Sequence, residues 1–172
     1  MLTATLVAVV SLVLVQDEIA NPEYGRWASF GTGSEVVMRT VDASHDMEMR
    51  STTTLQSKGD KEIALEVEIS LVVAGTSVDL PARTRKLPAT IKRAFVGGAV
   101  EPPETGEETL GIAQHDLRCT WALAVIDSGE CTIRSEVWTC PQVPGGLVQM
   151  ASESTGAITM KVKQHLVSFV AQ

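Results

Sequence analysis

Apolar and polar side chains alternate strictly from Lys61 to Val73. The odd positions from 63 onward carry the large aliphatic residues, whereas the even positions include Glu62, Glu66 and Glu68. Successive side chains of a β-strand point to opposite faces, so a period of two is typical of a strand with one buried face and one wet face. A helix would scatter the glutamates around its circumference. The segment therefore predicts a long strand in a sheet with one apolar face.

The segment from His45 to Gln56 has the same phase and is joined to this strand by turn-forming residues. Two such strands around a short turn predict an antiparallel hairpin. With residues 58–60 as its loop, the hairpin places Leu55 opposite Ile63. A shift of this register by one residue would break both faces, because it would turn every side chain to the other side.

A short helix is expected between Asn21 and Gly31. Asn21 suits the N-cap, Pro22 the first helical position and Glu23 the first turn, and a glycine follows the end. The aromatic residues of this stretch recur every three positions and so share a face. We interpret the helix as a plug over one end of the sheet; the alternative is a lid over an apolar ligand site. These aromatic residues are Tyr24, Trp27 and Phe30.

Further alternation predicts the rest of an all-β, or β-dominated, single domain over residues 17–172, with one large curved antiparallel sheet built from long hairpins and the short N-terminal helix. Proline interrupts the segment after position 80, and proline removes a ladder donor, so this segment is expected at a sheet edge. The remaining strands are expected at Glu35 to Val41, Ser77 to Leu80, Asp116 to Val125, a return strand from Cys131, a strand through Met150, and Ala157 to Val170 with a bulge near Gln164.

The first residues predict export. The stretch from Leu2 to Val15 is almost wholly apolar, a length that suits the core of a signal peptide and is too short for a spanning helix. We therefore expect a signal peptide over residues 1–16 and a periplasmic or extracellular location in a bacterium, without a transmembrane span. No basic residue precedes the stretch, and a buried N-terminal strand or helix is the alternative. The first cysteine is Cys119, so a bacterial lipid anchor is not expected.

Charge separates along the chain. The formal net charge of the 172 residues is −7, which argues against general nucleic-acid binding because that needs a basic surface. Five of the 14 basic residues fall between Arg83 and Arg93, beside an acidic loop expected from Ala94 to Asp116. We interpret this basic edge as a solvated sheet edge; the alternative is a docking site for a protein partner through Arg83, Arg85 and Lys86.

Three cysteines make an odd count. In an oxidising compartment one pair can form a disulfide, and Cys119 with Cys140 is the better candidate because the two can meet near the base of one hairpin. Three buried thiols are an equally good interpretation. A zinc site is not expected, because the sequence has no C-x-x-C motif and its histidines are dispersed.

No catalytic motif is found. The sequence lacks G-x-S-x-G, H-E-x-x-H and a G-x-G-x-x-G after a strand, and its three histidines leave little room for acid–base chemistry near neutral pH. We therefore expect a protein without catalytic residues, metal or cofactor.

The stretch from Trp27 to Ser34, the long Thr- and Met-rich strands and the corner from Trp138 to Val148 resemble those of small exported bacterial proteins. The architecture of these proteins looks like that of the lipoprotein carriers of the LolA/LolB type. This resemblance implies a strongly curved antiparallel sheet whose concave face is covered by helical segments. The present chain differs in having few helical stretches, and no site residue is carried over from the family.

Long one-sided strands with few elements left to cover them favour a binding function. We expect a non-enzymatic envelope protein whose concave apolar face accepts a lipid-like or other apolar ligand, and methionines suit such a surface because they adapt their shape. The rival hypothesis is a structural or interaction protein that docks a partner through the basic edge. The expected ligand-binding residues are Trp27, Met47, Met49, Ile69, Leu71 and Trp121.

Overall fold

The computed structural model describes residues 18–73, 75–92, 104–112, 114–127, 131–156 and 159–172. The expected signal peptide and most of the glycine- and proline-rich part of the acidic loop lie outside these residues. The elements are β1 (Glu18–Ala20), α1 (Pro22–Ala28), β2 (Glu35–Asp42), β3 (Met47–Lys58), β4 (Glu62–Val73), β5 (Thr76–Pro88), β6 (Thr90–Lys92), β7 (Glu104–Ile112), β8 (His115–Asp127), β9 (Cys131–Thr139), β10 (Leu147–Gly156) and β11 (Met160–Val170).

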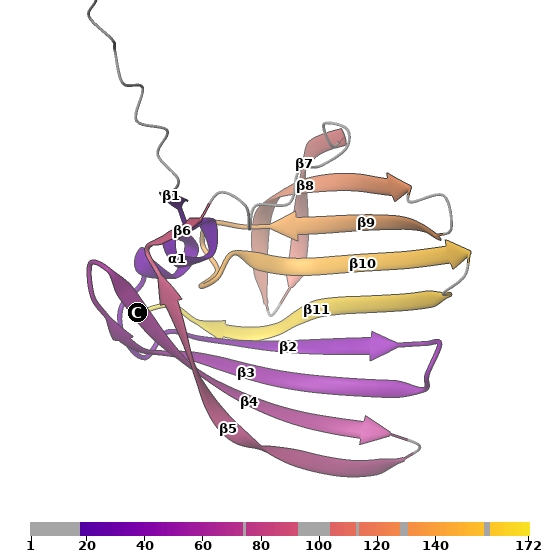
Figure 1. Ribbon diagram of the computed structural model, residues 1–172, viewed down its shortest axis with the longest axis horizontal. Coiled ribbons are helices and arrows are strands. Elements are labelled where there is room, and N and C mark those ends of the chain that lie inside the picture. The colour runs from indigo at the N-terminus through magenta and orange to yellow at the C-terminus, as the bar shows by residue number, and fades with distance from the viewer. Residues whose placement is uncertain (1–17, 74, 93–103, 113, 128–130, 157–158) are drawn as a thin grey trace, which may run out of the picture.

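The described chain forms one large antiparallel sheet and one short helix, so the predicted β-dominated fold is confirmed. Nine strands follow the order β5-β4-β3-β2-β11-β10-β9-β8-β7, and β1 pairs with β6 in a small second sheet. Figure 1 shows the large sheet curving strongly, with α1 and the C-terminus at the same end. The C-terminal strand β11 lies in the middle, between β2 and β10.

The pairing register gives the sheet one apolar face and one charged face. Residues paired across antiparallel strands share a face, so a row of side chains can be followed from strand to strand. One row is Val137, Met150, Gln164, Thr40, Met49, Leu71 and Val78, and we call its side of the sheet the apolar face. The neighbouring row is Trp138, Gln149, His165, Arg39, Arg50, Ser70 and Asp79, and we call its side the charged face.

Helix α1 closes one end of the apolar face. Asn21 caps the helix by accepting a hydrogen bond from the Glu23 backbone N–H at 3.0 Å. The Tyr24 hydroxyl donates to the Gly59 carbonyl in the β3–β4 turn at 2.8 Å, and Trp27 is buried. The side chains of the sheet at this end are buried as well, among them Leu55, Ile63, Leu65 and Leu87.

The β7–β8 hairpin crosses the charged face at the same end. Segment 115–119 of β8 runs beyond the last residue of β9, so it pairs with β7 alone. The His115 ring lies 5.1 Å from the Phe169 ring, which follows the bulge of β11, centroid to centroid, and the Leu117 side chain is buried. The main core is thus gathered at one end of the sheet, with α1 on one side and this hairpin on the other.

The hairpin register differs from the prediction. Leu55 pairs with Leu65 rather than with Ile63. The turn is displaced, so that Lys58 pairs with Ile63, and a bulge at Gln56 shifts the register by one residue between Leu55 and Ser57. From Leu55 back to Met47 each partner differs from the predicted one by two residues, and an even shift leaves these side chains on their predicted face.

Two edge segments are more regular than predicted. Strand β5 is continuous over 13 residues, with a register irregularity opposite Glu68 that accommodates Pro81. It is the edge strand expected from its prolines, which need no ladder partner there. Part of the predicted acidic loop is strand β7, the other edge. The bulge expected near Gln164 lies between Leu166 and Ser168.

Candidate functional site

Four of the six expected ligand-binding residues lie together on the apolar face. Met49 pairs with Leu71, and Met47 with Val73, while Ile69 follows on the same side of β4. All four expected residues are half-buried, so they border the core without being part of it.

The two tryptophans lie elsewhere. Trp27 is buried in the α1 plug, where a Cβ at Gly145 would lie only 2.8 Å from its Nε1. Trp121 pairs with Trp138 and so belongs to the charged face; its ring covers Gly106 on β7, where a Cβ would lie 2.6 Å from Nε1. The structure therefore places neither tryptophan beside the methionines.

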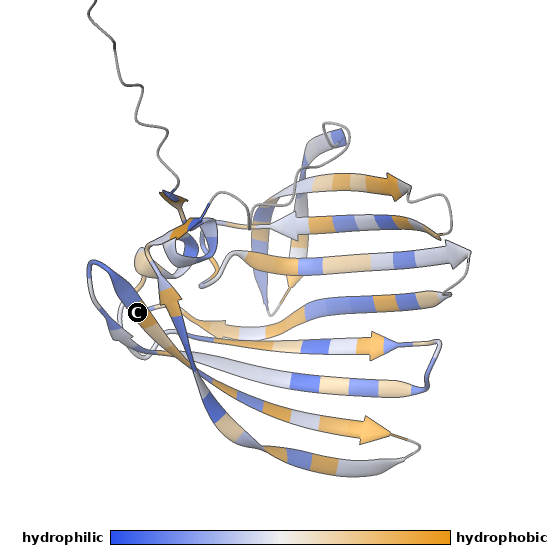
Figure 2. Ribbon diagram, viewed as in Figure 1, coloured by the Kyte–Doolittle hydropathy of each residue, from blue (hydrophilic) through white to orange (hydrophobic). Residues whose placement is uncertain are grey.

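The half of the apolar face away from α1 exposes large aliphatic side chains. Val73 is 48% exposed and Val78 is 49% exposed, whereas Leu55 and Ile63 under the helix are fully buried. In Figure 2 the C-terminal ends of β4 and β8, on the side opposite α1, carry hydrophobic colours. The exposed aliphatic residues of this half are Val73, Val78 and Leu80 on β4 and β5, and Ile126 and Ile133 on β8 and β9.

Polar groups interrupt the centre of the apolar face. The Thr40 side chain is buried, and its hydroxyl has no hydrogen-bond partner among the described residues. Asp42 is buried too, but it accepts from the Ser44 backbone N–H at 2.9 Å and bonds the His45 ring at 2.7 Å. The bond to His45 lowers the pKa of the Asp42 carboxyl, with the Ser44 bond adding to the effect.

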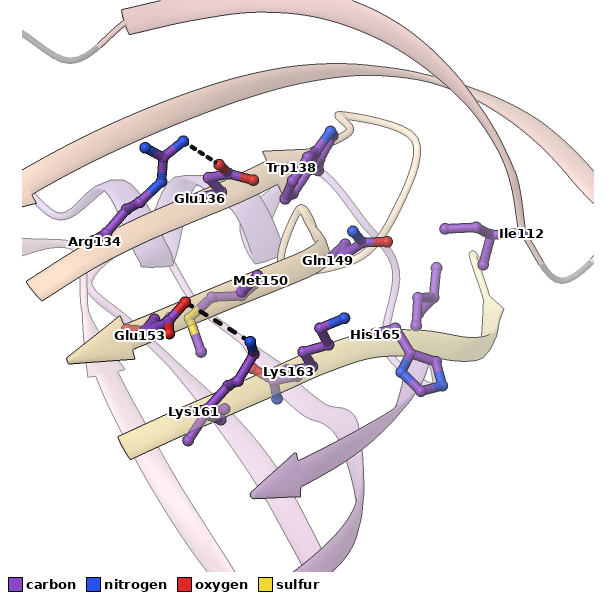
Figure 3. A pocket seen from close by; sticks show the side chains of 15 residues that line it. Ile112, Arg134, Glu136, Trp138, Gln149, Met150, Glu153, Lys161, Lys163 and His165 are labelled. Carbon is purple, nitrogen blue, oxygen red and sulfur yellow. Dashed lines mark hydrogen bonds and ion pairs between the residues drawn. The ribbon is translucent and has the colours of Figure 1, made fainter. Parts of the chain in front are cut away.

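A cleft of about 670 Å³ lies on the charged face beside the β7–β8 hairpin. Strands β9, β10 and β11 form its floor, and Ile112 at the end of β7 forms part of its wall. Figure 3 shows Arg134, Glu136 and Trp138 rising from β9 into this space. This volume falls in the range of small-molecule sites, roughly 300–1,000 Å³. The other lining side chains of the charged face are Gln149, Ala151, Glu153, Lys161, Lys163 and His165.

Ion pairs neutralise most of the charge in the cleft. Arg134 lies 2.9 Å from Glu136, and Lys161 lies 3.9 Å from Glu153. Lys163 has no ion-pair partner within the described part of the chain. The cleft therefore keeps one unpaired ammonium group, between the two ion pairs and His165.

The basic edge is partly neutralised by the chain itself. Arg85 forms a two-point ion pair with Glu23 of α1 at 2.7 Å, and Lys86 lies 2.9 Å from Glu62. Arg83 is exposed on the same strand. The structure thus brings the three expected docking residues onto one edge strand, but two of them already bind carboxylates.

Cys119 and Cys140 are neighbours. The Thr120–Thr139 pair ends the β8–β9 ladder, and the two cysteines occupy the next position on each side. Both are buried thiols, and burial raises the pKa of Cys119, with the nearby Cys140 adding to the rise. The geometry keeps the proposed disulfide available.

Among the described residues, no cluster of three or more His, Cys, Asp or Glu side chains suits a metal ion. The Asp42–His45 pair is an acid–base pair by composition. The hydroxyl of Ser44, which lies between the two in sequence, accepts a hydrogen bond from the Lys161 backbone N–H at 2.9 Å. These bonds hold the β2–β3 turn together and attach it to β11, so we assign them a structural role.

The cleft was not foreseen from the sequence. Its charged residues alternate along β9 and β11, a pattern typical of any strand with one wet face, and its wall comes from a strand expected to be a loop. The missed signal is the run from Thr109 to Ile112, in which Leu110 and Ile112 alternate with Thr109 and Gly111 directly after two glutamates.

Comparison with protein-family models and with curated proteins gives no match to this chain. Among solved structures, a weak similarity is found to the 12:0-ACP thioesterase from Umbellularia californica. The identity is 10%, the TM-score is 0.17, and the match covers 82% of this chain and 77% of the thioesterase chain. A likeness at this level says nothing about function. Within the described residues, no helix has the length and apolar character needed to cross a bilayer.

Proposed function

We propose that the protein is a non-enzymatic, exported protein of the bacterial envelope that binds a lipid-like or other apolar ligand on the apolar face of its sheet. The observation that carries the proposal is the exposure, between 37% and 49%, of five aliphatic side chains on the half of this face away from α1: three on β4 and β5, and two on β8 and β9. Water-exposed apolar surface of this kind is typical of ligand or partner sites.

The lining suits flexible hydrocarbon. Met47 pairs with Val73, and Met49 pairs with Leu71, the partner of Val78, so both methionines extend the exposed apolar surface of β4 and β5. Methionine adapts its shape to irregular apolar ligands. The buried side chains beneath α1 give the site a rigid end. The resemblance to lipoprotein carriers points the same way, because it implies a curved sheet with an apolar inner face.

The test uses N-phenylnaphthylamine, a neutral dye whose fluorescence rises in apolar surroundings. The V73S/V78S double variant changes two exposed side chains of the apolar face, so the fold is expected to remain intact. We expect the dye to bind the unmodified protein and to bind this variant about thirtyfold more weakly, because about 1 kcal/mol is lost for each of the two valines removed from the contact.

The matched control is V72S/V125S. These valines are also exposed, but both lie on the charged face, next in sequence to Val73 and Ile126 respectively. The control is expected to bind the dye as the unmodified protein does. Equal loss in both double variants, or no uptake by any of the proteins, would contradict binding on the apolar face.

Docking through the basic edge is the second candidate. It is favoured by the position of β5 as an exposed edge strand, because edge strands offer unpaired backbone groups to a partner. It is weakened by the two ion pairs that already engage Arg85 and Lys86. Replacing Arg83, Arg85 and Lys86 by serine without any change in the proteins that co-purify would count against it.

A further inference from the structure

We infer that the cleft on the charged face is a second binding site, for a small organic anion that carries one acidic group and a flat apolar body. The site lies on the side of the sheet opposite the proposed lipid-binding face, so the two can be occupied and tested independently. Three features carry the inference: the rigid floor, the unpaired ammonium group and the apolar end.

The floor is fixed by the sheet itself. Strands β9, β10 and β11 lie in the interior of the nine-stranded sheet, with a paired neighbour on each side. The Trp138 ring is held in place because its Nε1 donates to the Glu108 carboxylate of β7 at 3.0 Å. Pairing on both sides fixes the backbone of the floor and so the point from which each of its side chains starts, which preorganises the site.

The charge of the cleft selects an anion. Its basic side chains are Arg134, Lys161 and Lys163, and its acidic side chains are Glu136 and Glu153. The two ion pairs cancel four of these charges, which leaves the Lys163 ammonium group in a protein of net charge −7. An ammonium beside a neutral amide, here Gln149 on the next strand, offers donors to a carboxylate, sulfonate or phosphate group.

The far end of the cleft is apolar. The Trp138 ring and Ile112 line the cleft from β9 and from the end of β7, and Figure 3 shows both at the end away from Arg134 and Lys161. Flat hydrocarbon bodies pack well on an indole ring. A plain inorganic anion would leave this end unfilled, so the site favours a ligand with both parts.

The test uses anilinonaphthalene sulfonate, which carries one sulfonate on the ring system of N-phenylnaphthylamine. We expect it to bind the full protein, to bind the K163Q variant about tenfold more weakly, and to bind K163R nearly normally, since K163Q loses a charge-assisted hydrogen bond that K163R keeps. Lys163 is exposed, so these variants are expected to fold. The K92Q variant, at an exposed lysine of β6, is the control.

Neutral N-phenylnaphthylamine should be unaffected by K163Q, and the part of the sulfonate-dye binding that benzoate displaces should be unaffected by V73S/V78S. Benzoate should displace the sulfonate dye, whereas inorganic phosphate should not. The inference is overturned if K163Q and K92Q bind the sulfonate dye equally well, or if phosphate displaces it as effectively as benzoate. Failure of the neutral dye to bind would refute the lipid proposal while leaving this site standing.

Discussion

Single residues show where this sheet departs from a simple division into apolar and polar faces. Thr40 lies in the middle of the apolar face, between Gln164 and Met49, and its buried hydroxyl has no partner among the described residues. A buried polar group without a hydrogen bond costs free energy, because its bonds to water are lost on folding. Thr40 is therefore a position at which the sequence is not optimised for stability.

Replacing the Thr40 hydroxyl by a methyl group should stabilise the protein. We expect T40V to raise the free energy of unfolding by about 1 kcal/mol, since the desolvation cost disappears and apolar area is gained. Urea unfolding measures the change. T53V, at a half-buried position of the same face, is the control and should change stability much less. A loss of stability in T40V would mean that the hydroxyl has a partner in solution.

At the scale of elements, α1 and the corner from Cys140 to Gly146 form the plug of the apolar face. The Gly145 N–H donates to the Arg26 carbonyl at the end of the helix at 3.3 Å. Gly145 has a φ of 75°, a conformation that glycine adopts without strain, and its missing side chain makes room for Trp27. The plug therefore depends on a residue without a side chain at this position.

Adding a methyl group at Gly145 should loosen the plug. G145A is expected to lower the free energy of unfolding by about 2–4 kcal/mol, because the strain of a left-handed alanine adds to the overlap with Trp27. G75A is the matched control: its φ is 78° and no atom lies within 4 Å of the added Cβ, so only the backbone strain of about 1 kcal/mol applies. Equal losses, measured by urea unfolding, would contradict close packing of Trp27 against the corner.

Most elements could be predicted from alternation, because a period of two is visible wherever one face is buried. Strand β4 and the helix cap at Asn21 are examples. The hairpin register could not be predicted, since the bulge at Gln56 leaves no mark in the pattern. Strand β7 could not be predicted because glutamates dominate its first half. The face on which each of its side chains lies is set by long-range pairing with β8.

The candidate site was predictable only in part. Met47, Met49, Ile69 and Leu71 share a face because of local alternation, which the sequence displays. The placement of Trp121 on the other face depends on the relative phase of distant strands, and that phase is carried through the ladder from β8 to β4. Single-strand patterns contain no information about this phase.

As a whole, the molecule is a sheet with a closed end and an open end. The closed end has α1 on the apolar face and the β7–β8 hairpin on the charged face, and it contains the core. The open end carries exposed aliphatic side chains, most of them on the apolar face, and the cleft lies on the charged face beside the β7–β8 hairpin. This division separates the stability of the protein from its proposed binding surfaces, so surface variants at the open end should fold normally.

Ligand binding on the apolar face is tested most directly by native mass spectrometry of the protein purified from the organism that makes it, followed by solvent extraction. We expect a reproducible mass above that of the polypeptide, which extraction removes as a lipid and which is reduced in V73S/V78S but retained in V72S/V125S. A bare polypeptide mass, together with no uptake of N-phenylnaphthylamine, would contradict ligand binding on the apolar face and leave docking at the basic edge as the better explanation.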